Sequence, residues 1–270
     1  MSNKQNEFYT SISKYYSEIF PYQPMQLQFV KSRAGELAGK QILDIGSATG
    51  ELAFQLANEG AKVTGIDLNE DLLNQALSKT GYSGFPAQRS GGRSADSGIR
   101  ESEFATPNPK FQTGNMLEIA TDFKPTLFDL VLCFGNTLVH LHTPELMQQM
   151  LNGVFSVLKP GGQFLLQILN YNYILNEQVS ELPIIETENI RFIRKYRFKE
   201  NSPLICFQTE LFLKKESNSI VNETMLFALK SAELTELLKN SGFFEIEMFS
   251  NFKQETPGGK HLPVVVICRK

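Results

Sequence analysis

Short apolar segments alternate with helical patterns from Lys40 to the end of the sequence. This rhythm is typical of a mostly parallel sheet with helices on both faces. The five expected strands are residues 41–45, 61–68, 110–114, 126–134 and 163–169. Two later apolar segments, 243–249 and 262–268, follow an expected helix at Ala232–Asn240 and predict a closing hairpin at one sheet edge. The pattern therefore predicts an α/β fold.

Helix boundaries are marked by capping residues. Asn69 precedes the acidic pair Glu70 and Asp71, which favours a helix start. Thr143 followed by Pro144 is a second capped start, and the KPGG segment at 159–162 is expected to end that helix.

Two stretches interrupt the alternation. Residues 81–109 contain five Gly, five Ser and three Pro, with Ile99 as the single aliphatic residue, so we expect a mobile surface loop. Residues 184–229 contain segments of period two, which predict an antiparallel β elaboration inserted after the fifth strand.

Composition limits the classes of function. The 270 residues carry a net charge of −3, so no global field attracts polyanions. The polar start lacks a signal core, and no apolar run is long enough to cross a membrane. The three cysteines lack metal-ligand spacing, so we expect no metal and a reducing, cytoplasmic location. One basic strand leaves an RNA substrate open, because its cations share a face: Arg191, Lys195, Arg197 and Lys199.

The glycine-bearing loop of ILDIGSATG is the strongest chemical signal. It follows the first strand, where doubly wound sheets bind ligands. Asp67 ends the second strand, where it is placed to accept hydrogen bonds from ribose hydroxyls. A dinucleotide would also suit these features, but the glycine spacing departs from G-x-G-x-x-G and Glu51 would repel a pyrophosphate. Asp44 adds a further negative charge beside the loop, so a cationic ligand fits this site better than an anionic one.

Read together, DIGSATG, VTGIDL, GNMLEI, FDLVLCFGNTLVHL and LKPGGQFLLQ resemble a class I S-adenosylmethionine-dependent methyltransferase over residues 40–270. The resemblance implies a Rossmann-like doubly wound sheet of seven strands, mostly parallel with an antiparallel last strand. It implies that S-adenosylmethionine is cradled by Asp44, Gly46, Ser47, Ala48, Gly50, Asp67, Leu68, Asn115, Met116, Phe134 and Gly135. Two of these depart from the usual pattern, since Ala48 replaces a glycine and Asn115 replaces an aspartate.

The segments CFGNTLVHL and ILNYNYIL are similar to those of glycine N-methyltransferase and related bacterial enzymes of small molecules. The resemblance implies that Asn136 and His140 belong to the catalytic site, and that Asn170 and Tyr171 contact substrate. Leu169 stands where an arginine would hold a glycine carboxylate, so another amine is the expected acceptor. Each of these polar residues also has a purely structural interpretation, as a cap, a turn or a buried hydrogen-bond partner.

In such relatives an N-terminal aromatic segment folds over the cofactor. The resemblance therefore implies a helical lid over residues 1–39, with Tyr15 facing substrate and Tyr16 facing cofactor. The expected function is methyl transfer to a small-molecule amine. An RNA methyltransferase and a non-catalytic protein that binds an adenosyl ligand are the alternatives, and the oligomeric state is open.

Overall fold

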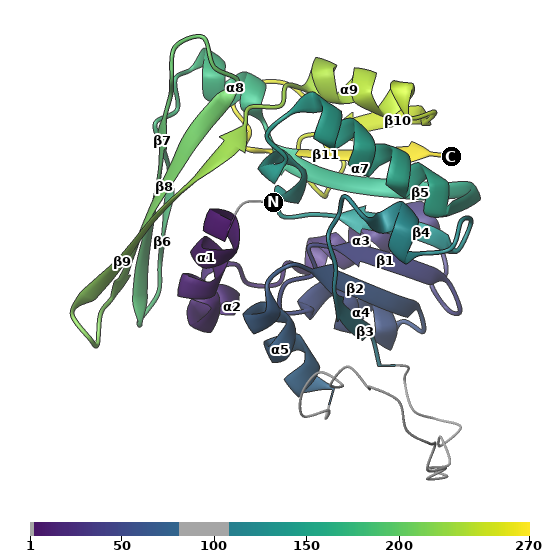
Figure 1. Ribbon diagram of the computed structural model, residues 1–270, viewed down its shortest axis with the longest axis horizontal. Helices are drawn as coiled ribbons and strands as arrows, with labels where there is room; N and C mark the ends of the chain where they lie inside the picture. Colours follow the sequence, from purple (N-terminus) through teal and green to yellow (C-terminus); the bar gives the residue numbers. More distant parts are fainter. Residues whose placement is uncertain (1–2, 81–107) are drawn as a thin grey trace.

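The computed structural model describes residues 3–80 and 108–270, so nearly all of the expected loop at 81–109 lies outside the described residues. The main sheet has seven strands in the order β10-β11-β5-β4-β1-β2-β3 (Figure 1). Its strands are β1 (Gln41–Ile45), β2 (Lys62–Asp67), β3 (Lys110–Thr113), β4 (Phe128–Cys133), β5 (Leu158–Leu169), β10 (Phe244–Phe249) and β11 (Pro263–Arg269). Strands β1 to β5 run parallel and β11 runs antiparallel to β5, which confirms the expected fold class.

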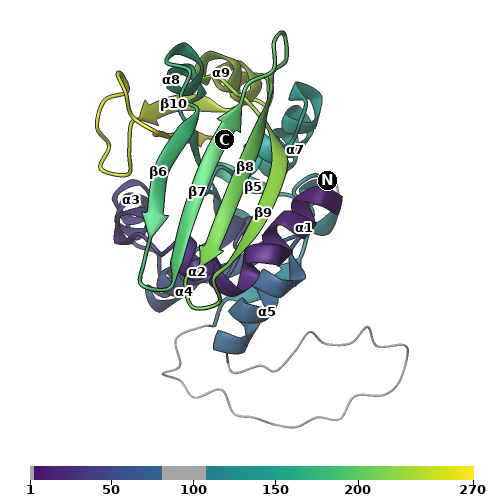
Figure 2. The ribbon, with the colours of Figure 1, turned by 90° about the vertical axis from the view of Figure 1, so that its left-hand side faces the viewer.

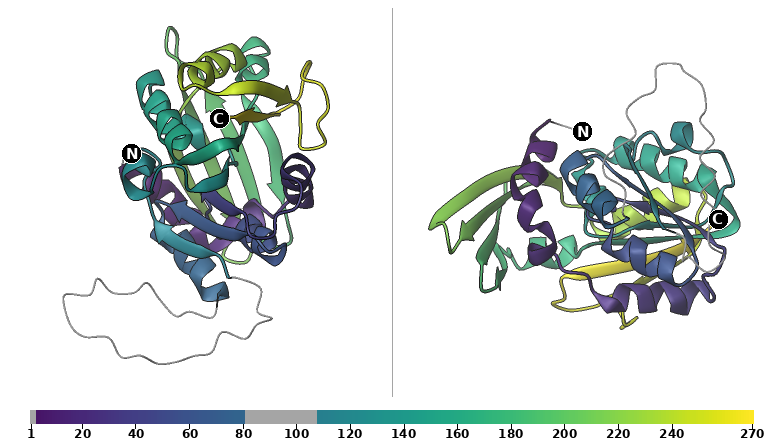
Figure 3. Two further views of the ribbon diagram at one scale, coloured as in Figure 1. Left: turned by 90° about the vertical axis from the view of Figure 1, so that its right-hand side faces the viewer. Right: turned by 90° about the horizontal axis from the view of Figure 1, so that it is seen from below.

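Helices cover both faces of this sheet, as Figure 3 shows. One apolar core lies under α3 (Pro24–Ala34), α4 (Glu51–Asn58) and α5 (Glu70–Lys79). The other lies under α6 (Ile119–Asp122), α7 (Pro144–Val157) and α9 (Ser231–Asn240). The expected caps are confirmed, because the side chains of Asn69 and Thr143 accept hydrogen bonds from Leu72 N and Leu146 N. The two packed layers fix the strand ends that form the site.

Helix α7 ends just before the KPGG segment, as expected, but the fifth strand begins earlier than the predicted residue 163. Helix α7 ends at Val157, and β5 begins at once with Leu158, so the segment lies within the strand. Gly161 takes a φ of +76°, and the pairing of β4 with β5 shifts register around the segment. Backbone bonds to the chain end, Gly161 N to Lys270 O and Lys270 N to Gly162 O, hold it in place. These long-range bonds hold the segment in the sheet, although Gly161 has the left-handed conformation that is typical of a turn.

The elaboration after β5 is a separate four-stranded antiparallel sheet, here called the second sheet (Figure 2). Helix α8 (Tyr171–Asn176) leads into its strands, β6 (Glu181–Glu186), β7 (Ile190–Arg197), β8 (Leu204–Leu213) and β9 (Asn218–Phe227). It begins three residues earlier than the predicted residue 184. The antiparallel pairing of these four strands confirms the β elaboration predicted from the period-two pattern.

The basic strand β7 carries its charges on the outer face of the second sheet. Lys195 pairs with Glu181 at 2.8 Å, and Arg197 pairs with Glu223 at 3.0 Å. Acidic residues on neighbouring strands therefore balance two of the four cations that had suggested RNA.

The N-terminal segment is helical, as expected, with α1 (Asn3–Ile12), a 3-10 turn (Ser13–Tyr15) and α2 (Tyr16–Ile19). Figures 1 and 3 show α1 between the second sheet and the α/β body. Phe8, Ile12 and Ile19 pack with residues of β7 and β8 in a third apolar cluster. The segment is thus attached to the second sheet by apolar contacts, and its other side faces the strand ends of the main sheet.

Candidate functional site

A cavity of about 230 Å³ lies at the carboxyl ends of β1, β2 and β4, under α1. Chain connections leave β1 and β4 toward opposite sides of the sheet there, and open α/β sheets bind ligands at such a switch point. The main-sheet side is lined by Ile45, Gly46, Ile66, Asp67, Leu68, Asn69, Leu72, Gly114, Met116, Phe134, Gly135, Thr137 and His140. The opposite side is formed by the N-terminal helices α1 and α2 and is lined by Gln5, Asn6, Tyr9 and Tyr16. The cavity is therefore formed jointly by the main sheet with its loops and by the N-terminal helices.

The loop after β1 fits closely against the loop after β4. Gly46 has a φ of +74°, and a Cβ on it would lie 2.7 Å from Thr137 Oγ1. Gly50, which precedes α4, also has a positive φ, and a Cβ there would meet the Phe111 ring at 2.5 Å. Two of the predicted loop residues are thus required to be glycine by backbone conformation and by space.

We expect Gly46→Ala to destabilise the protein more than Gly39→Ala. Both positions have a positive φ, but a Cβ on Gly39 meets nothing within 4 Å. The left-handed backbone costs each alanine about 1–2 kcal/mol. The clash with Thr137 adds about 1–3 kcal/mol at Gly46 alone. Urea unfolding of the two variants measures this difference, and equal losses would contradict the close fit.

One carboxylate, that of Asp67, lines the cavity, and a second, that of Asp44 at the end of β1, is buried nearby outside the lining. Asp67 Oδ2 accepts a hydrogen bond from Ala48 N at 3.0 Å, and its Oδ1 accepts one from Asn69 N at 2.9 Å. Burial raises its pKa, and these backbone bonds oppose the rise. Asp44 is 5% exposed, and burial, together with the charge of Asp67, raises its pKa to about 7. Such a pair favours a cationic ligand, because a positive charge lowers the cost of ionising both groups.

Glu51 requires a correction. The sequence argument used its charge against a pyrophosphate, but the structure pairs it with Lys79, whose Nζ also donates to Thr49 O at 2.9 Å. Its charge is therefore largely balanced. The preference of the site for a cation rests on Asp44 and Asp67 instead.

The structure separates the predicted cofactor residues into two groups. Those that line the cavity are Tyr16, Gly46, Asp67, Leu68, Met116, Phe134 and Gly135. Those outside the lining are Asp44, Ser47, Ala48, Gly50 and Asn115. Asn115 makes a local turn in which its Oδ1 accepts from Leu117 N at 3.1 Å, while Gly114 and Met116 on either side face the cavity. Ser47 Oγ is buried without a hydrogen-bond partner among the described residues.

Asn136 and Tyr171 form one hydrogen-bonded pair beside the cavity. Asn136 Nδ2 donates to the Tyr171 hydroxyl at 3.0 Å, and its Oδ1 accepts from Leu169 N at 2.9 Å. Asn136 has a φ of +68° and precedes the turn that carries His140. Its amide thus joins the loop after β4 to the end of β5, and neither member of the pair is in the cavity lining.

Asn170 caps α8, with its Oδ1 accepting from Tyr173 N at 3.1 Å. Its Nδ2 donates to His261 O at 3.1 Å. Tyr15 lies away from the cavity, and its hydroxyl is 3.3 Å from Glu216 Oε1 in the turn between β8 and β9. The structure therefore does not bring Asn170 and Tyr15 into the cavity lining.

His140 connects α1 to the loop after β4. Its Nε2 lies 2.9 Å from the Tyr9 hydroxyl, while its Nδ1 is buried without a partner in the described residues. Burial lowers its pKa to about 3, and nearby His142 adds to the effect. The imidazole is therefore neutral at pH 7 and a weak proton acceptor.

Nine lining residues were missed by the sequence reasoning, and four of them are Gln5, Asn6, Tyr9 and Thr137. Asn6 Oδ1 accepts from Asn69 Nδ2 at 2.8 Å, so the start of α1 is bonded to the cap of α5. Gln5 and Tyr9 are four positions apart and share a helix face. That spacing was the available signal, but only the packed structure shows what the face meets.

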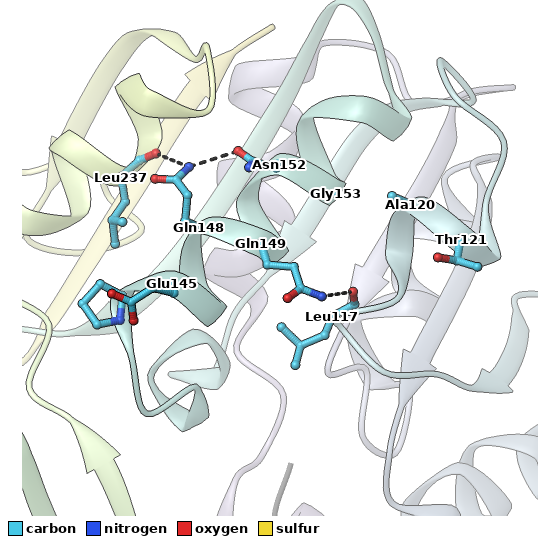
Figure 4. Close-up of a pocket in the computed structure, with 10 residues that line it drawn as sticks. Leu117, Ala120, Thr121, Glu145, Gln148, Gln149, Asn152, Gly153 and Leu237 are labelled. Carbon is cyan, nitrogen blue, oxygen red and sulfur yellow. Dashed lines mark hydrogen bonds between the residues drawn. The ribbon is translucent and has the colours of Figure 1, made fainter.

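A second, open groove of about 710 Å³ crosses α6, α7 and α9 (Figure 4). Its amides are bonded within the protein, with Gln149 Nε2 donating to Leu117 O at 3.1 Å and Gln148 Nε2 to Asn152 Oδ1 at 3.0 Å.

Across the described part of the chain, no cluster of metal-ligating side chains occurs. No helix within residues 3–80 or 108–270 has the length and apolarity of a membrane span.

Comparisons with known proteins agree with this geometry. A family profile described as "Methyltransferase domain" matches residues 36–242. The ubiquinone biosynthesis O-methyltransferase of Bordetella bronchiseptica is 30% identical over 149 residues, which are 55% of this chain and 51% of that protein. The match thus spans about half the length of that relative. A Geobacillus sp. (strain WCH70) protein that carries a methyltransferase name is 29% identical over 97% of this chain and 99% of its own.

Solved structures share the fold. A crystal structure of an S-adenosylmethionine-dependent methyltransferase from Clostridium acetobutylicum superposes with a TM-score of 0.72 at 16% identity, covering 99% of both chains. The sugar N-methyltransferase KedS8 from Streptoalloteichus gives 0.64 at 14% identity, covering 95% of this chain and 92% of its own. At such identities the likeness concerns the fold alone.

Proposed function

Since this chain belongs to the family described as "Methyltransferase domain", we propose that it is an S-adenosylmethionine-dependent methyltransferase that methylates a small-molecule acceptor on an amine nitrogen. The observation that carries the proposal is the position of Asp67, at the base of a cavity closed on one side by glycine backbone and on the other by α1. The amine is supported by the motif likeness of residues 133–141 and 168–175 to glycine N-methyltransferase.

The residues fit an adenosyl sulfonium. Asp67 has acceptor lone pairs left beyond its two backbone bonds, which suits a ribose diol. Met116, Leu68 and Ile66 offer apolar surface for a flat base. Gly46 and Gly135 allow close approach of backbone, and buried Asp44 provides negative potential. S-adenosylmethionine supplies an activated methyl group, so the protein needs no nucleophile of its own.

The chain's own task is positioning. In-line alignment of acceptor and methyl carbon contributes several kcal/mol through proximity alone. Tyr9, Tyr16 and α1 exclude water from above the cavity, and dry surroundings favour the neutral, nucleophilic form of an amine. His140 stays neutral and orients the acceptor as a hydrogen-bond partner. Asn136 and Tyr171 hold the turn that carries His140 in place.

We expect His140→Ala to lower kcat by about 100-fold, because misplacement of the acceptor by about 1 Å has effects of that size. The affinity for S-adenosylmethionine should stay within a few-fold. Since the pKa of His140 is held near 3, the wild-type rate should show no inflection from this group between pH 6 and pH 8. The matched control is His142→Ala, which removes a histidine whose Nε2 is hydrogen-bonded to Met225 O. An inflection near pH 6.5 that disappears in the variant would contradict the orienting role.

A two-stage assay tests the proposed function. Thermal shift and calorimetry with S-adenosylmethionine come first, since a ligand at 100 times its Kd adds about 2.7 kcal/mol of stability. Formation of S-adenosylhomocysteine is then followed over a panel of small amines, phenols and acids. Turnover of amines above phenols supports the proposal. Binding without turnover by any acceptor would favour a non-catalytic protein, and turnover of RNA with a steep salt dependence would favour the RNA alternative.

A further inference from the structure

Polar atoms without partners gather on the inner face of the second sheet, the face that α1 covers. Tyr196 OH, Thr209 Oγ1 and Arg194 Nε are buried and make no hydrogen bond within residues 3–80 and 108–270. Tyr196 and Thr209 are each 3% exposed. Buried polar atoms are nearly always paired, so three unpaired ones on one sheet face need an explanation.

Strand register brings these three side chains together. Arg194 on β7 is directly opposite Thr209 on β8, which places their Cβ atoms about 4.5–5.5 Å apart. Tyr196 lies two residues beyond Arg194 and therefore on the same face. Thr209 is in turn opposite Asn222 on β9, whose Nδ2 donates to Ser11 Oγ of α1 at 2.8 Å. This row of polar side chains across the second sheet thus ends at α1.

The chemistry of the three groups is that of hydrogen-bond donors around one positive charge. Arg194 uses Nη2 for Pro183 O at 2.7 Å, and no carboxylate among the described residues pairs with it. Its outward neighbours on the same strand, Lys195 and Arg197, do have carboxylate partners. A guanidinium and two hydroxyls are a donor set that suits an oxyanion.

None of the three donor residues is in the cavity lining, but Tyr196 leads toward the cavity through Tyr171 and Asn136. The Tyr196 and Tyr171 side chains belong to the same apolar cluster, and burial, followed by the neighbouring Tyr171 hydroxyl, raises the pKa of Tyr196. Tyr171 in turn accepts from Asn136, beside the turn of His140. Phe8 of α1 packs on Phe207, which packs on Tyr196, so displacement of α1 would expose the donor set and the cavity together.

We propose that Arg194, Tyr196 and Thr209 bind an oxyanion, a carboxylate or a phosphate, carried by the methyl acceptor, while its nucleophilic atom reaches the cavity. The inference rests on the proposed function and deepens it by naming an anionic group on the substrate.

The test uses small anions as probes on the full chain saturated with S-adenosylhomocysteine. Benzoate and inorganic phosphate distinguish the two anions, and benzamide is the neutral counterpart of benzoate. One of the anions should raise Tm by about 2–4 °C at tens of millimolar, and benzamide should not. Arg194→Met should abolish the rise, whereas Arg191→Met on the outer face of β7 should retain it. Absence of a rise with both anions, or a rise retained in Arg194→Met, overturns the proposal.

A second readout does not depend on a ligand. If Thr209 is kept for binding, Thr209→Val should raise the Tm of the unliganded protein, because it removes an unsatisfied hydroxyl at constant volume. A lowered Tm would mean that the hydroxyl has a structural partner, which also overturns the proposal. Calorimetry with S-adenosylmethionine distinguishes failure of the oxyanion proposal from failure of the proposed function. If the protein binds the cofactor but no anion raises its Tm, only the oxyanion proposal fails and the methyltransferase proposal stands.

Discussion

Asp67→Ala is expected to weaken S-adenosylmethionine binding by at least about 100-fold, because two hydrogen bonds to a charged carboxylate contribute about 1.5–3 kcal/mol each. The ribose diol is the proposed donor of both. Isothermal calorimetry on the purified protein measures the loss. Unchanged affinity would overturn the assignment of Asp67 to the ribose.

The variant needs two controls, since Asp67 also accepts from Ala48 N and Asn69 N. Asp71→Ala, at an exposed position in the first turn of α5, removes the same charge nearby and should leave affinity unchanged. Asp67→Asn keeps the shape of the side chain while presenting one donor in place of an acceptor. Thermal unfolding of each variant shows whether the loops around Asp67 have remained folded.

Affinity for S-adenosylmethionine should rise about fivefold from pH 6 to pH 7. The pKa of Asp44 is raised to about 7, so the group is mostly protonated at pH 6 and half ionised at pH 7. A cation binds the ionised form more tightly, and binding therefore releases a proton. Calorimetry in buffers of different ionisation enthalpy measures that proton directly. A flat profile, or uptake of a proton, would show that the cation does not sense Asp44.

Asp44→Asn is the matched variant, because it keeps the shape and removes the titration. Its affinity should be flat over the same pH range. The sign for folding is opposite to that for binding: the folded state holds the proton more tightly than the unfolded chain, whose Asp44 titrates near 3.8. The contribution of Asp44 to stability is thus complete below about pH 4 and is lost as pH rises through 7. Asp44→Asn should remove this part of the decline in the free energy of unfolding.

The site shows where local pattern was sufficient. Gly46, Asp67 and Phe134 were found because each stands at the end of a strand whose apolar pattern is local, and parallel strands bring their carboxyl ends to one edge. The caps Asn69 and Thr143 were found for the same reason, since a cap bonds within one helical turn. Even the second sheet followed from period two, which a half-buried strand imposes on its own sequence.

The sequence by itself therefore determined the α/β fold, the glycine loop and the acidic strand end, all of which depend on neighbours along the chain. Only the tertiary structure decided that Tyr9 meets His140, that Glu51 is balanced by Lys79, and that Arg194 lies inward while Lys195 and Arg197 are paired outward. Each of these depends on the docking of segments far apart in sequence. Side-chain periodicity gives the face of an element, but the partner of that face is set by packing.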